Sequence, residues 1–288
     1  MKNLFQKSLK ISVGVALALF LTSCGNSEYK LFDPKGPIAN EQMWLIIHST
    51  WIMLLVVVPV IIMAIWFPIK YRKNNDKNEY LPDWEHSNKI EAVVWTIPIL
   101  IIIALGVITY ITSFSLDPRK PIKSDKPAMV VQVVAMDWKW LFIYPEQQIA
   151  TVNEIAIPVD RPIEFLVTSD TVMNSFFIPN LGSQIYAMSG MENRLHLIAS
   201  EVGTYQGISA NYSGFGFSGM KFSTIVTNEQ GFDEWVVSVK SSQSPLDDSA
   251  FRELRVKSRD VPPKYFSDVN PLLFSEIIEQ YTGGLNGK

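Results

Sequence analysis

The stretch MWLIIHSTWIMLLVVVPVIIMAIWFPI, residues 43–69, decides the architecture of this 288-residue chain. It exceeds the roughly 20 apolar residues that a helix needs to cross about 30 Å of hydrocarbon. A second stretch, IEAVVWTIPILIIIALGVITYITSF at 90–114, has the same character. Both are apolar on every face, whereas a helix packed on a soluble core would carry a polar stripe. The sequence therefore predicts two transmembrane helices, at 43–69 and 90–114.

Charges beside the two spans indicate their orientation. The segment before the first span, 24–42, has two basic residues, whereas the connecting loop, 70–89, has five: Lys70, Arg72, Lys73, Lys77 and Lys89. Short loops rich in lysine and arginine stay on the cytoplasmic side of the membrane. We therefore expect the loop in the cytoplasm, and both the segment 24–42 and everything after residue 115 on the outer, periplasmic face.

The first 23 residues have the composition of a bacterial secretory signal peptide. Three lysines precede an apolar run, Ile11 to Leu21, that is too short to span a bilayer. The run ends in Leu-Thr-Ser-Cys24, which resembles the lipobox at which bacterial lipoproteins are cleaved and acylated. Cys24 is therefore a predicted lipidation site, and the alternative is an incidental cysteine. A lipid on Cys24 would add a membrane anchor outside the cytoplasm.

Short alternating runs replace the long apolar stretches after residue 115. They occur at 129–138, 153–159, 162–169, 193–199, 204–209 and 220–227, separated by Pro, Gly, Asn and Asp. Strands at such spacing indicate a sandwich or barrel, which we place at 115–228. Helical spacing of apolar residues follows at 229–288. The predicted fold class is thus membrane α plus all-β: two transmembrane helices, a β-sandwich or barrel, and a short helical C-terminal region.

Composition argues against two classes of function. The formal net charge is −3 and no basic, aromatic stripe occurs, which argues against binding nucleic acid. One cysteine and three histidines leave little material for a protein-only transition-metal site. Any metal chemistry is therefore expected in a partner.

A few residues could carry chemistry by themselves. Glu91 opens the second span, where an acid either begins a proton path or is an N-terminal acid stabilised by the helix dipole. His48, near the outer end of the first span, could relay protons or bind a quinone headgroup, but an interfacial histidine reaching polar groups is favoured. His196 alternates with leucines and is expected to face solvent. The aromatic run MDWKWLFIYP, 136–145, is expected to pack against the membrane domain or a partner rather than to form an electron-transfer surface.

Two spans, a sandwich on the outer face and the motif HSNKIEAVVWTIP at 86–98 together resemble subunit II of the haem–copper respiratory oxidases. In the cytochrome c oxidase members, the resemblance implies a cupredoxin domain with a dinuclear copper centre. Its ligands are a histidine after one strand and a loop of the form Cys-x-Glu-x-Cys-x3-His-x2-Met. The stretch GISANYSGFGFSGMKF, 207–222, matches that loop in length.

On this pattern, the residues at the copper-ligand positions lack copper-binding chemistry. Both thiolates and both imidazoles, the ligands that suit copper, are replaced, and a lone thioether is a weak ligand. We call these six positions the remnant positions: Asn174, Ser209, Asn211, Ser213, Phe217 and Met220.

The replaced ligands point to the quinol-oxidising branch of that family. MDWKWLFIYPEQ (136–147), VMNSFFIPNLGSQ (172–184) and LGSQIYAMSGM (181–191) closely resemble subunit II of the cytochrome bo-type ubiquinol oxidases of proteobacteria. The resemblance implies quinol as the substrate of the complex, with haems, copper and the quinone site in subunit I. It implies no cofactor, metal or cytochrome c for this chain. It also implies that Glu91 lies at the entrance of a proton channel.

The resemblance implies that the chain is a non-redox-centre subunit of a proton-pumping quinol oxidase in the bacterial inner membrane, with a role in assembly and support. Its expected partners are oxidase subunit I, the other oxidase subunits and membrane lipid. Two alternatives stay open at this stage. One is a copper-containing subunit II of a cytochrome c oxidase, and the other is a membrane-tethered binding lipoprotein without an enzyme partner.

Overall fold

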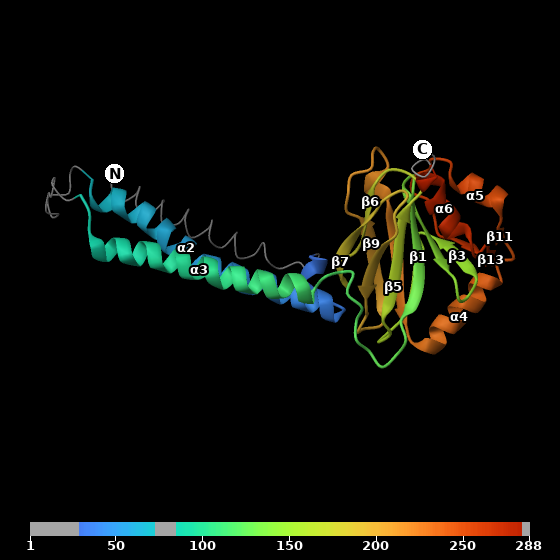
Figure 1. Ribbon diagram of the computed structural model, residues 1–288, viewed down its shortest axis with the longest axis horizontal. Helices are drawn as coiled ribbons and strands as arrows, with labels where there is room; N and C mark the ends of the chain where they lie inside the picture. Colours follow the sequence, from blue (N-terminus) through green and yellow to red (C-terminus); the bar gives the residue numbers. More distant parts are fainter. Residues whose placement is uncertain (1–28, 73–84, 284–288) are drawn as a thin grey trace, which may run out of the picture.

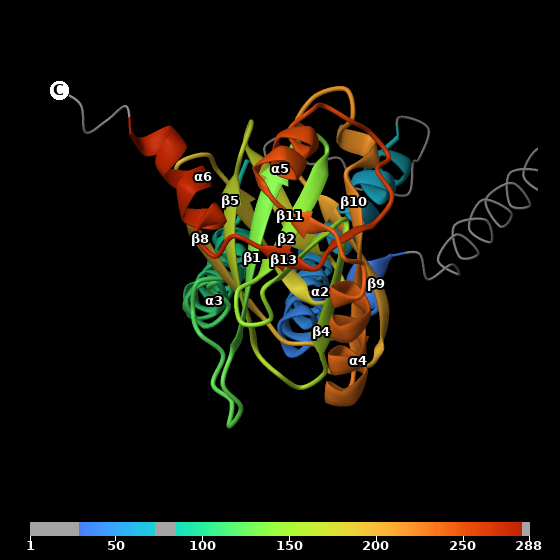
Figure 2. The ribbon, with the colours of Figure 1, turned by 90° about the vertical axis from the view of Figure 1, so that its right-hand side faces the viewer.

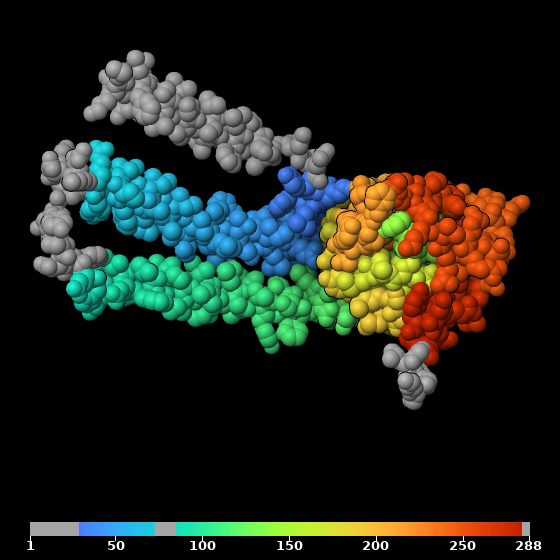
Figure 3. All heavy atoms as spheres, turned by 90° about the horizontal axis from the view of Figure 1, so that it is seen from above, coloured from blue at the N-terminus to red at the C-terminus, as the bar shows by residue number. Residues whose placement is uncertain are grey.

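Two long helices project side by side from one side of a β-sandwich in the computed structural model, which describes residues 29–72 and 85–283 (Figures 1 and 3). Helix α2 spans Pro37–Lys70 and α3 spans Asn88–Ser115, and a short 3-10 helix, η1, precedes them at Lys30–Phe32. Both helices are long and apolar enough to cross a membrane, and their apolar side chains are exposed. The predicted spans 43–69 and 90–114 lie inside α2 and α3. Cys24 lies outside the described residues.

The sandwich consists of a six-stranded and a five-stranded sheet. The first has the order β12-β3-β2-β1-β5-β8 and the second has the order β4-β10-β9-β6-β7. Most neighbours are antiparallel, but β1 pairs with β5 and β10 pairs with β4 in parallel. The first ten strands are β1 Met129–Met136, β2 Lys139–Tyr144, β3 Ile149–Val152, β4 Glu154–Pro158, β5 Ile163–Ser169, β6 Asn174–Ile178, β7 Gly182–Ala187, β8 Asn193–Leu197, β9 Gly203–Ser209 and β10 Lys221–Thr227.

Each alternating run predicted from the sequence contains a strand of the sandwich. Strands β2, β3, β6 and β7 fall outside those runs, and β2 lies in the aromatic run 136–145. Strand β6 is buried along most of its length and β3 along all of it, so neither shows the alternation that identifies a half-exposed strand.

The aromatic run 136–145 lies inside the sandwich, which corrects the expectation that it packs on the membrane domain or a partner. Trp140, Phe142 and Tyr144 of β2 are fully buried. The rings of Trp140 and Phe142 contact those of Phe176 and Phe222, which stack on each other with centroids 5.1 Å apart. Period two was a correct indication of one common face, but that face lies between the two sheets.

The part of the C-terminal region after residue 240 covers the outer face of the six-stranded sheet (Figure 2), whereas Phe232 and Val239 of its first helix belong to the core between the sheets. In chain order, the region contains α4 Glu229–Lys240, β11 Pro245–Leu246, α5 Asp248–Leu254, β12 Lys264–Phe266, β13 Asp268–Val269 and α6 Leu273–Thr282. The predicted helical character is confirmed in α4, α5 and α6. Strand β12 adds to the edge strand β3, and β11 pairs with β13. Because this region covers it, β2 is buried on both faces.

Two polar contacts attach the C-terminal region to the sandwich. Lys139, 1% exposed, donates hydrogen bonds of 2.8 Å to the carbonyl oxygens of Leu254 and Val256 at the end of α5. Arg255 donates two hydrogen bonds, of 2.8 and 2.9 Å, to the buried carboxylate of Asp170. These contacts join the start of β2 and the end of β5 to a segment more than 80 residues away in sequence.

The segment before α2 fits between the two sheets at the side from which the spans leave. The amide of Lys35 donates to the carbonyl of Asn180, and the carbonyl of Lys35 accepts from the amide of Ser200. A Cβ atom on Gly36 would lie 2.4 Å from the backbone oxygen of Ile198. Gly182 has φ +102°, and a Cβ there would meet the backbone of α2. The first span is therefore docked on the sandwich through close backbone contacts.

His196 is buried, which contradicts the expectation that it faces solvent. Only 5% of it is exposed, its amide donates to the carbonyl of Pro118, and its Nε2 lies 3.7 Å from a carboxylate oxygen of Glu164. Alternation placed it correctly on the face opposite the leucines. The chain leaving α3 runs across that face, which local alternation does not reveal.

Candidate functional site

The loop between β9 and β10 is the turn of an antiparallel hairpin, and it carries four of the six remnant positions between residues 211 and 220. The amide of Ser209 donates to the carbonyl of Met220 over 3.1 Å, which closes the loop at its base. A 3-10 turn, η2 at Phe217–Gly219, leads back into β10. Gly214 adopts φ +108°, a conformation that favours glycine. The loop thus has its own backbone hydrogen bonds.

Three of the remnant positions meet at the base of this loop. The Ser209 hydroxyl donates to the Asn174 side-chain oxygen over 3.1 Å, because β6 and β9 are neighbours in the sheet. The Asn174 amide group donates in turn to the carbonyl of Val172 over 3.0 Å. Asn174, Ser209 and Met220 are at most 5% exposed. Asn211 lies beside them and donates to the carbonyl of Met173 over 3.2 Å.

Trp138, which the sequence analysis did not single out as a site residue, packs against the middle of the loop. Its indole N–H donates to the carbonyl of Ser213 over 3.1 Å. A Cβ atom on Gly216 would lie 2.3 Å from the indole ring, so the loop approaches Trp138 as closely as glycine allows. The ring of Phe217 contacts that of Tyr212, with centroids 5.7 Å apart. The available signal was the position of Trp138 at the start of the aromatic run.

The donor set of this loop does not fit a copper pair. The structure brings together an amide, a hydroxyl and a thioether at the positions of Asn174, Ser209 and Met220, and these atoms already hydrogen-bond to one another or lie in the apolar core. Thiolates and imidazoles are the ligands that hold copper in such sites. No group of three or more His, Cys, Asp or Glu that could hold a metal occurs in the described parts of the chain.

Glu91 lies in the first turn of α3, at the end of the helix far from the sandwich. Its amide donates to the carbonyl of Ser87, and its side chain is exposed. Within residues 29–72 and 85–283 its carboxylate makes no hydrogen bond or ion pair. Twenty-four residues of helix separate Glu91 from Ser115, or about 36 Å at 1.5 Å per residue. The structure therefore separates Glu91 and the remnant positions by about the thickness of a membrane.

His48 is engaged within its own helix. Its Nδ1 lies 2.7 Å from the carbonyl oxygen of Trp44, one turn earlier, and the two rings contact each other with centroids 5.5 Å apart. This arrangement agrees with the favoured interpretation of a histidine that reaches nearby polar groups.

Comparison with known proteins assigns the chain to a family. Residues 145–229 match the family described as cytochrome c oxidase subunit II, periplasmic domain, and residues 240–284 match the COX aromatic rich motif. The cytochrome bo(3) ubiquinol oxidase subunit 2 of Pseudomonas aeruginosa is 54% identical over 269 residues, which cover 93% of this chain and 80% of that protein. The chain belongs to the quinol oxidase subunit 2 family.

Other members of the quinol oxidase subunit 2 family align over most of the chain. The ubiquinol oxidase subunit 2 of Acetobacter aceti is 51% identical over 288 residues, covering 99% of this chain and 92% of that protein. The quinol oxidase subunit 2 of Bacillus subtilis is 41% identical over 251 residues, covering 86% and 77%.

Among solved structures, the periplasmic domain of cytochrome oxidase subunit II (CoxB) of Bradyrhizobium japonicum aligns with a TM-score of 0.40 and 22% identity, over 43% of this chain and 99% of that domain.

Proposed function

We propose that this chain is the supporting subunit 2 of a proton-pumping quinol oxidase and that its cupredoxin-like sandwich works without copper. The observation that carries the proposal is the β9–β10 loop, in which Ser209, Asn174 and Trp138 supply the contacts of the base and middle. A loop held by its own hydrogen bonds keeps its shape without a metal. Because the loop offers no redox-active ligand set, electrons from quinol would reach haem in subunit I directly.

In this proposal the sandwich covers the periplasmic face of subunit I. The close contacts of Gly36 and Gly182 fix the first span to the sandwich, so the spans and the sandwich would be positioned together on the partner. The exposed apolar surfaces of α2 and α3 would be divided between lipid and the partner subunit. A lipid on Cys24 would add a further anchor on the same side of the membrane.

The proposed role of Glu91 is to take up protons at the cytoplasmic edge of the membrane. Its carboxylate lies in the first turn of α3, is exposed, and has no hydrogen bond or ion pair with the described residues, so it would be available to face a water-filled channel of subunit I. An ionisable group at the end of a membrane helix is a functional candidate because burying it in lipid is costly. The chain would thus contribute a proton acceptor on one side of the membrane and a docking domain on the other.

One experiment tests the proposal as a whole. The membrane complex that contains this chain is purified, and its oxygen consumption is measured with quinol and, separately, with reduced cytochrome c, together with a metal count for each complex. We expect oxygen consumption with quinol and none with reduced cytochrome c. We also expect no copper in this subunit after it is separated from the others. Turnover with cytochrome c, or copper that stays with the separated chain, would refute the proposal. A preparation without haem would indicate a binding lipoprotein.

A further inference from the structure

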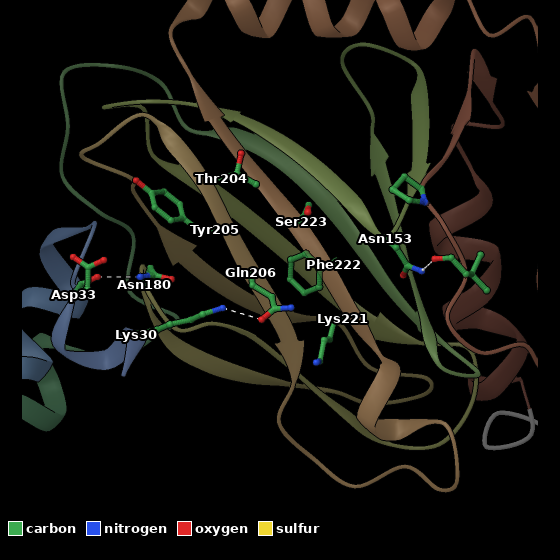
Figure 4. A pocket seen from close by; sticks show the side chains of 12 residues that line it. Lys30, Asp33, Asn153, Asn180, Thr204, Tyr205, Gln206, Lys221, Phe222 and Ser223 are labelled. Atoms are coloured by element: carbon green, nitrogen blue, oxygen red, sulfur yellow. Dashed lines mark hydrogen bonds between the residues drawn. The ribbon is translucent and has the colours of Figure 1, made fainter. Parts of the chain in front are cut away.

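An open groove of about 560 Å³ lies on the outer face of the β9–β10 hairpin, beside the segment that leads into the first span (Figure 4). One wall is the turn around Lys30 and Asp33, and the other is the C-terminal segment Val261–Pro263. The floor carries outward-facing polar side chains from the two strands. These are Thr204, Gln206, Lys221 and Ser223. We call this feature the basic groove.

Two lysines give the basic groove its charge. Lys30 reaches across to β9 and donates a 2.8 Å hydrogen bond to the side-chain oxygen of Gln206, while Lys221 stands on the neighbouring strand (Figure 4). Neither ammonium group has a carboxylate within ion-pair distance among residues 29–72 and 85–283. Burial and the positive charge of Lys221 lower the pKa of Lys30. The two charges therefore oppose each other with no compensating anion from the described chain.

The carboxylate in the groove wall is already engaged elsewhere. Asp33 lies 3.1 Å from the ammonium group of Lys35, which also contacts Glu201 at 2.7 Å. Tyr205, at the same end, donates its hydroxyl to the carbonyl of Glu201. Asp33, the acid among the lining residues of the groove, is thus paired with Lys35, and the end that contains Lys30 and Lys221 is the electropositive one.

We propose that the basic groove is the docking site for an acidic segment of another subunit of the oxidase, whose carboxylates would pair with Lys30 and Lys221. The inference rests on the proposed function, because it needs the chain to be part of a multisubunit complex. The groove is open along its length, as an extended segment requires, and its floor of hydroxyl and amide groups can hydrogen-bond to a peptide backbone. Opposite charges across such a surface favour the correct partner.

A lipid headgroup fits the groove less well because of its height. The six residues 37–42 of α2 separate Gly36 from the apolar span, and Gln42 is hydrogen-bonded to Ser183 of β7. Six helical residues rise about 9 Å. The groove, which lies before α2 in the chain and beside β9 and β10, is therefore set above the level at which the apolar part of α2 begins.

Zero-length cross-linking of the intact, purified oxidase tests this inference. A carbodiimide joins a lysine amine to a carboxylate in direct contact, and the joined peptides are identified by mass spectrometry. We expect Lys30 and Lys221 to be joined to Asp or Glu of another oxidase subunit. The Lys30→Gln and Lys221→Gln double variant should lose these products, whereas Lys240→Gln, which changes an exposed lysine at the end of α4, should retain them.

Two ion pairs within this chain serve as internal standards. Lys35–Glu201 at 2.7 Å and Lys126–Glu229 at 3.1 Å should be cross-linked in every folded preparation, including both variants. Raising the salt concentration should reduce the intersubunit products, because salt screens ion pairs that are partly exposed to solvent. Each such pair changes the docking equilibrium by about two- to fivefold.

Three results would overturn the inference. In each, the internal standards are formed as expected. The first is that, when the complex is treated with a lysine-acetylating reagent, Lys30 and Lys221 react as fast as Lys240. The second is that the carbodiimide joins them only to acids of this same chain. The third is that they are protected from acetylation but form no cross-link, as a bound small anion would cause. Quinol turnover of the same preparation is measured separately, so that failure of the docking inference and failure of the proposed function are distinguished.

Discussion

Replacing Arg255 by Met is expected to loosen the C-terminal helix α6 from the sandwich. The guanidinium binds the Asp170 carboxylate through two hydrogen bonds, and the Tyr281 hydroxyl of α6 donates to the backbone carbonyl of Asp170. The side chain of Asp170 is 1% exposed and that of Arg255 is 34% exposed. The substitution leaves a buried carboxylate without its counter-charge.

The magnitude follows from this partial burial. Removing one partner of a fully buried pair costs about 3–5 kcal/mol, whereas an exposed pair contributes about 0–1 kcal/mol. With one partner buried and the other one-third exposed, we expect about 2–3 kcal/mol, which is about 30- to 150-fold in an equilibrium constant. Burial raises the pKa of Asp170 and the Arg255 charge opposes that rise, so the carboxylate is the group at risk when Arg255 is lost.

Hydrogen exchange of the α6 amides in the complete chain measures this effect, because local opening sets the exchange rate. Arg255→Met should speed exchange by the stated factor, and adding Asp170→Asn should recover part of the loss by removing the unpaired charge. Arg252→Met changes an exposed arginine in the last turn of α5 and is the matched control. Exchange in Arg255→Met no faster than in Arg252→Met would refute this expectation. So would a double variant as unstable as the two single effects added together.

Four further outcomes are expected. Gly36→Ala should destabilise the docking of the segment before α2 by about 1–3 kcal/mol and expose it to protease. Gly106→Ala, where a Cβ meets no atom within 4 Å, should not. Equal digestion of the two variants would refute the close contact at Gly36. Burial lowers the pKa of Lys139, so just below pH 10.5 the unfolded chain binds more protons than the folded chain does. Resistance of the C-terminal region to protease should therefore rise with pH in that window. A rise that persists in Lys139→Met would contradict this. Glu91→Gln should slow oxygen reduction by the assembled oxidase, and unchanged turnover in a fully assembled complex would count against proton uptake there. Restoring the copper ligands should confer copper absorption on the purified chain, and a colourless product would mean that the scaffold no longer positions them; the changes are Asn174→His, Ser209→Cys, Asn211→Glu, Ser213→Cys and Phe217→His.

Local pattern determined the helical and alternating parts of this protein. Runs 43–69 and 90–114 predict membrane helices because their length and apolarity are sufficient evidence. Strands β1, β5 and β10 are predicted by alternating or continuous apolar residues within a short run. The remnant positions were assigned by the resemblance in sequence, and none of the six holds a Cys or a His. Glu91 could be placed in the first turn of α3 because it lies at the beginning of the apolar run 90–114.

Only the tertiary structure decided what covers each face. Trp138 and Gly216, 78 residues apart, form one contact in the β9–β10 loop, and His196 is buried by a segment that leaves α3. The aromatic face of β2 belongs to the interior because the second sheet closes over it. Such contacts join segments far apart in the chain, and a periodic pattern reports which side chains share a face without specifying what packs on it. The sequence therefore determined the elements and the missing copper chemistry, and the packing of distant segments determined the loop's support, the buried histidine and the basic groove.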